Sequence, residues 1–162
     1  MTAIDRMLEL NRSYLSDGFV GKQPTQHLAV LTCMDTRIDP QKALGLQPGV
    51  AHVIRNAGGM VTPDALRSLA ISQRALDTRE IAVVMHTDCG LNGFDDAAFR
   101  ASLAVESGRQ PGWDVPGFTD LEAAVQRNVT QIRQCPWLQT DQVRGFVYDV
   151  GTGRVAEIAG TT

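Results

Sequence analysis

Short β-rich runs alternate with longer amphipathic stretches along this chain. Three runs rich in β-branched and other apolar residues are typical of strands, and they cover residues 27–33, 51–55 and 80–85. Two longer stretches repeat apolar residues every three or four positions, as one face of a helix does, over residues 64–76 and 119–134. Strands that alternate with helices predict an α/β fold with a mostly parallel central sheet flanked by helices.

The two ends of the chain follow other patterns. A helix is predicted over about residues 3–15, with an apolar side formed by Ile4, Met7, Leu8 and Leu15. It either closes its own domain or packs on another subunit, and the pattern does not decide between the two. Residues 144–158 hold two short β-rich runs around a glycine-flanked turn, which predicts a C-terminal hairpin or edge strand. Residues 106–118 are rich in turn formers and predict an irregular surface connection.

Length and charge narrow the class of protein. A chain of 162 residues fits a single domain over residues 1–162 and can bury roughly 70% of its unfolded surface. A net charge of −3 gives no electrostatic reason to expect nucleic acid or an anionic membrane as a partner. No apolar run approaches the ~18 residues that span a bilayer, and the start lacks the pattern of a signal peptide. We therefore expect a cytoplasmic protein, whose reducing surroundings suit thiolate ligands.

The three cysteines are an odd number, which argues against a disulfide framework. Cys33 and Cys89 stand at the ends of predicted strands, beside other polar functional groups. Cys135 has no such neighbours and is predicted to be a small buried residue, since free cysteine is commonly buried for packing alone.

Cys33, His86 and Cys89 form the candidate metal site. Cys33 ends the first predicted strand, His86 ends the third, and Cys89 follows three positions later. Ligands of a parallel sheet gather beyond the carboxyl ends of its strands, so these side chains converge if the two strands are neighbours. Two thiolates and one imidazole suit Zn²⁺ and leave a fourth position for water. Water held there becomes a nucleophile near neutral pH, which predicts an enzyme.

Asp35 and Arg37 follow Cys33 at alternating positions. In an extended segment these three side chains point to the same side, toward the metal. Positive charge nearby keeps the aspartate ionised. Two roles remain open for Asp35: direct ligation as a fourth zinc ligand, or pairing with Arg37 while accepting a hydrogen bond from zinc-bound water.

Other polar and small residues have weaker signals. His27 and His52 stand near strand starts and are interpreted as structural, and Asp88 as a residue that satisfies the amides of its turn. Gly58 and Gly59 follow the second strand, and paired glycines let the backbone approach a ligand closely. They are candidate substrate-binding residues, although turn formation alone explains them equally well.

Three segments carry a family resemblance: CMDTR at 33–37, RNAG at 55–58 and HTDCG at 86–90. In this order and spacing they resemble the β-class carbonic anhydrases, most of all the short bacterial members. The resemblance covers residues 27–105 well and the rest loosely. It implies a parallel-centred sheet and a homodimer or dimer of dimers, in which the first helix embraces the partner subunit. The segment 58–61 varies among relatives, so this likeness does not define the substrate-facing wall.

The same likeness implies a chemistry. By matching motifs, Cys33, His86 and Cys89 would bind zinc, and Asp35 with Arg37 would form the catalytic dyad. The implied reaction is reversible hydration of carbon dioxide to bicarbonate and a proton by zinc-bound hydroxide. In some members the aspartate moves onto zinc and closes the enzyme at lower pH. Two alternatives stay open: hydrolysis of carbonyl sulfide or carbon disulfide on the same scaffold, and a non-catalytic zinc-stabilised protein.

Overall fold

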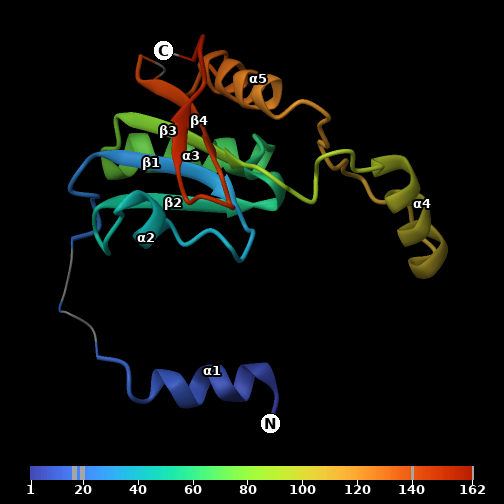
Figure 1. Ribbon diagram of the computed structural model, residues 1–162, viewed down its shortest axis with the longest axis horizontal. Helices are drawn as coiled ribbons and strands as arrows, with labels where there is room; N and C mark the ends of the chain where they lie inside the picture. Colours follow the sequence, from blue (N-terminus) through green and yellow to red (C-terminus); the bar gives the residue numbers. More distant parts are fainter. Residues whose placement is uncertain (16–17, 19–20, 140, 162) are drawn as a thin grey trace.

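A five-stranded sheet forms the centre of the computed structural model, which describes residues 1–15, 18, 21–139 and 141–161 (Figure 1). Its order is β2-β1-β3-β4-β5. The strands are β1 (Leu28–Cys33), β2 (Ala51–Asn56), β3 (Glu80–His86), β4 (Val143–Tyr148) and β5 (Val155–Glu157). Strands β1 to β4 pair in parallel with one another, and β5 pairs antiparallel with β4. The predicted parallel sheet with a C-terminal strand pair is thus confirmed.

Five α-helices accompany the sheet in the described part of the chain. They are α1 (Ala3–Asn11), α2 (Pro40–Leu44), α3 (Pro63–Leu76), α4 (Asp96–Ser107) and α5 (Leu121–Arg133). The predicted helices over 64–76 and 119–134 are present as α3 and α5. A side chain caps the start of each helix. Thr62 precedes Pro63, the first residue of α3, and accepts a hydrogen bond from the Ala65 amide; Asp120 accepts one from the Ala123 amide at the start of α5.

The core lies between the sheet and these two helices. α3 contacts β1 and β2, and α5 contacts β3 and β4. Every residue of β1 after Leu28 is buried, as expected for a central strand covered on both faces. The largest fully buried apolar side chains are Leu31, Leu69, Ile81, Met85, Ile132, Val30, Val83, Val125, Val129 and Val143.

The register of β1 and β3 decides where the candidate ligands fall. The two strands are parallel neighbours, and Thr32 pairs with Val84 near their ends. Cys33 and His86 therefore both stand at the carboxyl end of adjacent strands. Adjacency of these strands, on which the predicted convergence depended, is confirmed.

Two helices were absent from the sequence prediction. α2 is a short helix after β1, capped by Asp39 and ended by Gly45 in the left-handed region. α4 has no buried residue, and it projects from the body of the molecule (Figure 1). Its Phe99 ring packs on Phe94 and Trp113 rather than on the sheet. The core therefore imposes no apolar periodicity on α4, and the irregular connection predicted for 106–118 begins only after Ser107.

The first helix is shorter than predicted and lies apart from the sheet (Figure 1). It ends at Asn11, and a capping box between Thr2 and Asp5 fixes its start. None of its residues is buried. Among the described residues, no helix combines the length and apolar character that crossing a bilayer demands.

Candidate metal centre

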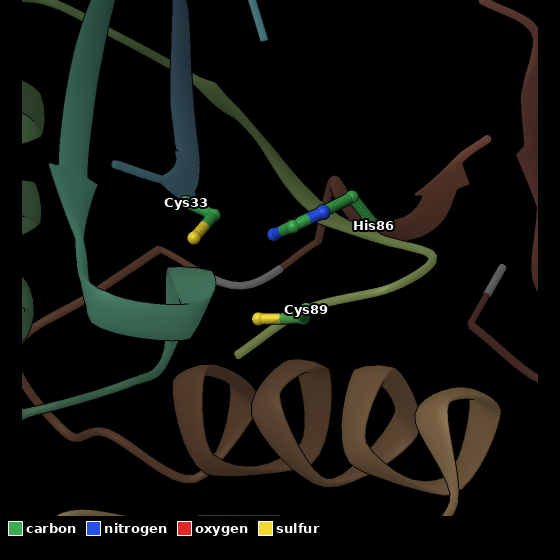
Figure 2. Close-up of side chains that lie close together, drawn as sticks. All are labelled: Cys33, His86 and Cys89. Atoms are coloured by element: carbon green, nitrogen blue, oxygen red, sulfur yellow. The ribbon is translucent and has the colours of Figure 1, made fainter. Parts of the chain in front are cut away.

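Three buried ligand atoms converge at the carboxyl ends of β1 and β3. The Sγ atoms of Cys33 and Cys89 and a ring nitrogen of His86 all lie within 4.8 Å of one another. Figure 2 shows the three side chains pointing into one space from the end of β1, the end of β3 and the turn that follows. Cys33, His86 and Cys89 are 5%, 1% and 8% exposed, respectively. Two sulfurs and one imidazole at this separation match a zinc site with three protein ligands.

His86 provides a test of whether a metal fits. Its Nδ1 lies 2.9 Å from the Thr87 carbonyl oxygen, so Nδ1 carries the proton and donates it. This tautomer leaves a lone pair on Nε2, which is buried and has no hydrogen-bond partner in the described part of the chain. A buried polar atom without a partner is costly. A metal ion at this nitrogen would remove that cost, and the backbone bond at Nδ1 is the usual way to orient a ligating histidine.

The thiol of Cys33 is prepared to ionise. Burial raises its pKa, but the His86 imidazole, when protonated, and the amides of Asp35 and Gly58 outweigh burial and bring the pKa down to about 7. Burial raises the pKa of Cys89, and the nearby Cys33 sulfur raises it further. A divalent cation between the two sulfurs would favour both thiolates, because positive charge nearby stabilises the ionised form.

The Gly58-Gly59 pair lies against Cys33. The Gly58 amide donates to Cys33 Sγ at 3.3 Å, from a residue with φ of 77°. A Cβ on Gly59 would stand 2.9 Å from the Thr32 carbonyl carbon, at a φ of 65°. Both features exclude ordinary side chains, since φ above zero and close backbone approach favour glycine. The pair thus supports the sulfur of Cys33, a candidate ligand, and its role in binding substrate stays a prediction.

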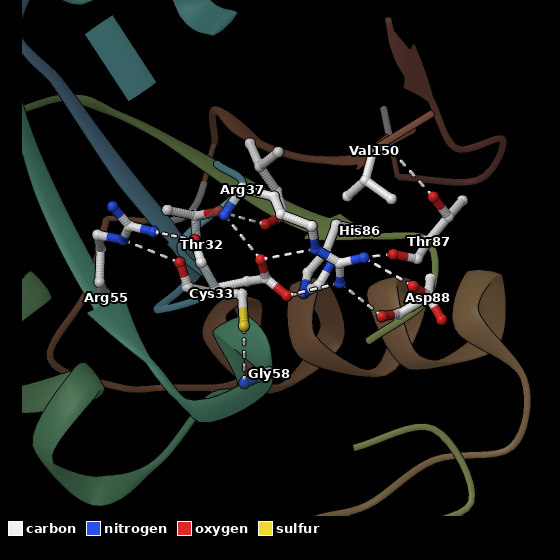
Figure 3. A network of polar contacts seen from close by, with 11 residues as sticks. Thr32, Cys33, Arg37, Arg55, Gly58, His86, Thr87, Asp88 and Val150 are labelled. Carbon is white, nitrogen blue, oxygen red and sulfur yellow. Dashed lines mark hydrogen bonds and ion pairs between the residues drawn. The ribbon is translucent and has the colours of Figure 1, made fainter. Parts of the chain in front are cut away.

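Asp35 and Arg37 form a two-pronged ion pair beside the candidate ligands; Figure 3 labels Arg37 and marks its contacts with dashed lines. Arg37 donates from Nε to Asp35 Oδ1 at 3.0 Å and from Nη2 to Oδ2 at 2.7 Å. The Arg37 amide adds a third bond to Oδ1 at 2.9 Å. These bonds hold the pKa of the Asp35 carboxyl well below its usual range. Asp35 Oδ2 stands 3.9 Å from His86 Nε2, so the carboxylate borders the ligand cluster while paired with Arg37.

The carboxylate of Asp88 has a different hydrogen-bond partner from the one predicted. Its carboxylate was interpreted as a partner for the amides of its turn, but Oδ2 instead accepts from Arg37 Nη1 at 2.6 Å. The Asp88 carbonyl also accepts from Arg37 Nη2 at 2.8 Å. Asp88 has a φ of 54°, in the left-handed region, and its side chain is 80% exposed, so it is free to reach Arg37 from the turn. Arg37 thereby ties the segment after β1 to the turn after β3.

Arg55 is a residue of the site that the sequence did not assign. From the end of β2 it donates to the Cys33 carbonyl at 2.9 Å and to the Asp35 carbonyl at 2.7 Å (Figure 3). These bonds fix the backbone that carries both side chains. The signal available in the sequence was the position of Arg55 at the start of the RNAG segment, as the last residue of a predicted strand.

The remaining candidates lie outside the cluster. His27 Nδ1 is 2.8 Å from the Asp77 carbonyl, and His52 Nδ1 is 2.7 Å from Ser72 Oγ. These bonds agree with the structural roles predicted for both histidines. Cys135 is buried at 7% exposure, as predicted for a packing residue.

Comparison with known proteins identifies relatives of this chain. The carbonic anhydrase family model matches residues 28–113. β-Carbonic anhydrase 1 of Mycobacterium tuberculosis (strain H37Rv) is 43% identical over 162 residues, covering 98% of this chain and 99% of that protein. The carbon disulfide hydrolase of Acidianus sp. (strain A1-3) is 45% identical, covering 94% of this chain and 87% of that protein.

A solved structure extends the agreement to three dimensions. The crystal structure of carbonic anhydrase from Streptococcus mutans has a TM-score of 0.90 and 38% identity, covering 98% of both chains. The family model alone spans more than half of the sequence, including both segments that supply the candidate ligands. Sequence, fold and family model agree, and the chain belongs to the β-carbonic anhydrase family.

Proposed function

We propose that this enzyme catalyses the reversible hydration of carbon dioxide to bicarbonate and a proton, with zinc held by Cys33, His86 and Cys89. The observation that carries the proposal is the buried cluster of two sulfurs and one imidazole within 4.8 Å, with His86 Nε2 free to ligate. Soft thiolates select zinc over hard cations such as magnesium and calcium. When bound, zinc supplies the Lewis acidity that makes water nucleophilic near neutral pH.

Asp35 orients the attacking water. Arg37 occupies both carboxylate oxygens and keeps the group ionised, so Asp35 accepts hydrogen bonds and does not donate them. Its Oδ2 borders the ligand cluster and is placed to accept from a water there. In the reaction the water oxygen bonds to carbon and one C=O electron pair moves to oxygen, giving bicarbonate. The released proton passes to the buffer.

Arg37 and Arg55 position this machinery. Arg37 holds the Asp35 carboxylate in one orientation, and Asp88 holds the far side of the guanidinium. Arg55 holds the Cys33 and Asp35 carbonyls, so sulfur and carboxylate keep a fixed separation. A rigid arrangement of this kind lowers the cost of ordering reactants in the transition state.

A stopped-flow assay of carbon dioxide hydration tests the activity. The zinc-loaded protein is expected to accelerate proton release at mildly alkaline pH, and the metal-free protein is expected to match the buffer alone. Adding zinc back to the metal-free protein restores the rate. Equal rates for the loaded and metal-free forms would contradict the proposal.

Carbon disulfide is the second candidate substrate, because relatives named carbon disulfide hydrolase reach 45% identity with this chain. The ligand cluster does not distinguish the two reactions, since both need the same activated water. Hydrogen sulfide release from carbon disulfide and from carbonyl sulfide, measured on the same zinc-loaded sample, separates them. A non-catalytic zinc protein is disfavoured, because a structural site normally has four protein ligands.

A homodimer is proposed, in which α1 packs on a second copy of the chain. Ile4, Met7 and Leu8 form an apolar side of α1 and are 67%, 59% and 53% exposed. A helix of nine residues is marginal by itself in water and normally needs packing to persist. Burial of this face against a partner supplies that packing. Pairing of two dimers is compatible with this arrangement.

Leu8→Glu is expected to weaken the dimer by tens of fold, the effect of losing about 2 kcal/mol at a central interface position. The dissociation constant is measured by sedimentation equilibrium. Arg6→Gln is the matched control, because it changes the net charge by the same amount on the opposite side of α1. A wild-type protein that sediments as a monomer, or equal effects of both substitutions, would exclude this interface.

A reducing compartment such as the cytoplasm is proposed as the location. All three cysteines are free, and two of them are the proposed zinc ligands. Oxidation of either ligand would remove a thiolate that the metal requires. Fractionation of cells that carry the tagged protein, with cytoplasmic and membrane markers, tests the location.

A further inference from the structure

Asn128, in α5, is a buried polar residue with two backbone partners on another segment. It is fully buried, its Oδ1 accepts from the Val61 amide at 3.1 Å, and its Nδ2 donates to the Gly59 carbonyl at 3.3 Å. Because one partner is an N–H and the other a carbonyl, only one orientation of the amide satisfies both. Asparagine has low helix propensity, and a buried amide is costly unless it is bonded. Its two bonds to the segment of Gly59 and Val61 explain why a buried asparagine stands in α5.

This loop, residues 57–61, leads directly to the ligand sulfur. Gly58, one residue before the Asn128 partner Gly59, donates its amide to Cys33 Sγ at 3.3 Å. Asn56 closes the loop internally: its Nδ2 donates to the Met60 carbonyl at 2.8 Å, and its Oδ1 accepts from the Met60 amide at 2.9 Å. The internal bonds keep the loop in shape, and Asn128 fixes that shape to α5. Displacement at Asn128 therefore moves the Gly58 amide relative to the sulfur.

A second contact reaches the strand that carries His86. Asn128 Nδ2 lies 3.4 Å from Met85 Sδ, and Met85 immediately precedes His86 in β3. One amide thus contacts both the loop that supports Cys33 and the strand end that presents the imidazole. We infer that Asn128 is a positioning residue of the metal centre, which holds the Gly58 amide on the Cys33 sulfur and thereby raises metal affinity. The inference rests on the zinc site proposed above.

Asn128→Leu tests the inference, with Gln73→Leu as a matched control. Gln73 on α3 also has a buried side-chain amide that holds a loop. Its Nε2 donates to the Gln139 carbonyl at 3.0 Å, and its Oε1 accepts from the backbone amide of Gln139 at 2.9 Å. It contacts none of the residues of the metal centre in these bonds. Both substitutions remove two hydrogen bonds between a buried side-chain amide and the backbone, so both are expected to lower the melting temperature. If Asn128 had only a structural role, the two variants would not differ in zinc affinity or in the environment of Gly58.

The discriminating measurements are zinc affinity, by competition with a chelator, and hydrogen exchange of the Gly58 amide in the metal-free protein. Asn128→Leu is expected to raise the zinc dissociation constant by about tenfold or more, as lost support of a metal ligand does. Gly58 exchange is expected to accelerate by about fivefold, the factor for a lost hydrogen bond of ordinary strength. Gln73→Leu is expected to leave both quantities at their wild-type values.

Wild-type zinc affinity and Gly58 exchange in Asn128→Leu would overturn the inference and leave the proposed function intact. Failure of the wild-type protein to bind zinc would instead overturn the proposed function. Gly58 exchange in the metal-free protein would then still decide whether Asn128 holds the loop. If Asn128→Leu does not fold, Asn128→Ser replaces it, because a serine side chain is too short to span both partners, and the same two measurements apply.

Discussion

Cys89→Ser is expected to remove zinc and, with it, carbon dioxide hydration. The substitution replaces a thiolate with a hydroxyl, which is a poor zinc ligand, and leaves two of the three converging ligand atoms. Structural zinc sites have binding free energies of about 10 kcal/mol or more, so one of three ligands contributes roughly 3 kcal/mol. The zinc dissociation constant should therefore rise by about 100-fold or more. Chelator competition measures this rise, and stopped-flow hydration measures the accompanying loss of rate at limiting zinc.

Cys135→Ser is the matched control for this substitution. Cys135 and Cys89 are 7% and 8% exposed, so both replacements put a hydroxyl in a buried position. Cys135 does not belong to the ligand cluster, and zinc affinity in this variant should equal that of the wild type. A similar loss of zinc in both variants would attribute the effect to disrupted packing. Full zinc affinity in Cys89→Ser would exclude Cys89 as a ligand.

The convergence of Cys33, His86 and Cys89 was predictable because it depends on strand order and little else. Cys33 and His86 end two runs that the sequence identifies as strands, and parallel strands bring their carboxyl ends together. Cys89 lies three residues after His86, so the local turn alone brings its sulfur close to the imidazole. What the sequence left open was whether β1 and β3 are neighbours, since the strand order of a sheet is a tertiary property.

The supporting residues were not predictable in the same way. Arg55 and Asn128 act through carbonyls and amides of other segments, 22 residues away in one case and 67 in the other. Backbone atoms carry no sequence signal, so nothing in the chain identifies their partners. Asp88 was misinterpreted for a related reason, because its contact with Arg37 spans 51 positions. Its exposed side chain was expected to bond locally, as aspartate in turns often does.

The outer helices show a different limit. α3 and α5 pack on the sheet, and their buried faces leave a periodic apolar pattern that the sequence reveals. α4 buries none of its residues, so no sheet-facing side of the helix marked it in the sequence. α1 has the pattern yet buries nothing in this chain. An apolar helix face without a partner within the chain is the feature that makes a second copy necessary in the proposed assembly.

Asp35→Asn is expected to retain zinc and lose about 100-fold in turnover, the lower part of the range for groups that assist proton movement in a transition state. The three ligands are untouched, so metal affinity should change little. The amide puts an NH₂ donor where the carboxylate has an acceptor, and it cannot receive both guanidinium bonds from Arg37. Stopped-flow hydration on fully loaded enzyme, with zinc content measured on the same sample, separates lost orientation from lost metal.

Asp88→Asn separates the role of Asp35 from a general loss of charge around Arg37. Both substitutions remove one carboxylate partner of the same guanidinium, but Asp88 is 80% exposed and only Asp35 borders the ligand cluster. An exposed ion pair contributes about 1 kcal/mol or less, so turnover in Asp88→Asn should fall by no more than about fivefold. Comparable losses in the two variants would mean that the orientation of Arg37 limits the reaction. Turnover retained in Asp35→Asn would remove the carboxylate from the mechanism and leave the metal ligands as the whole of the catalytic apparatus.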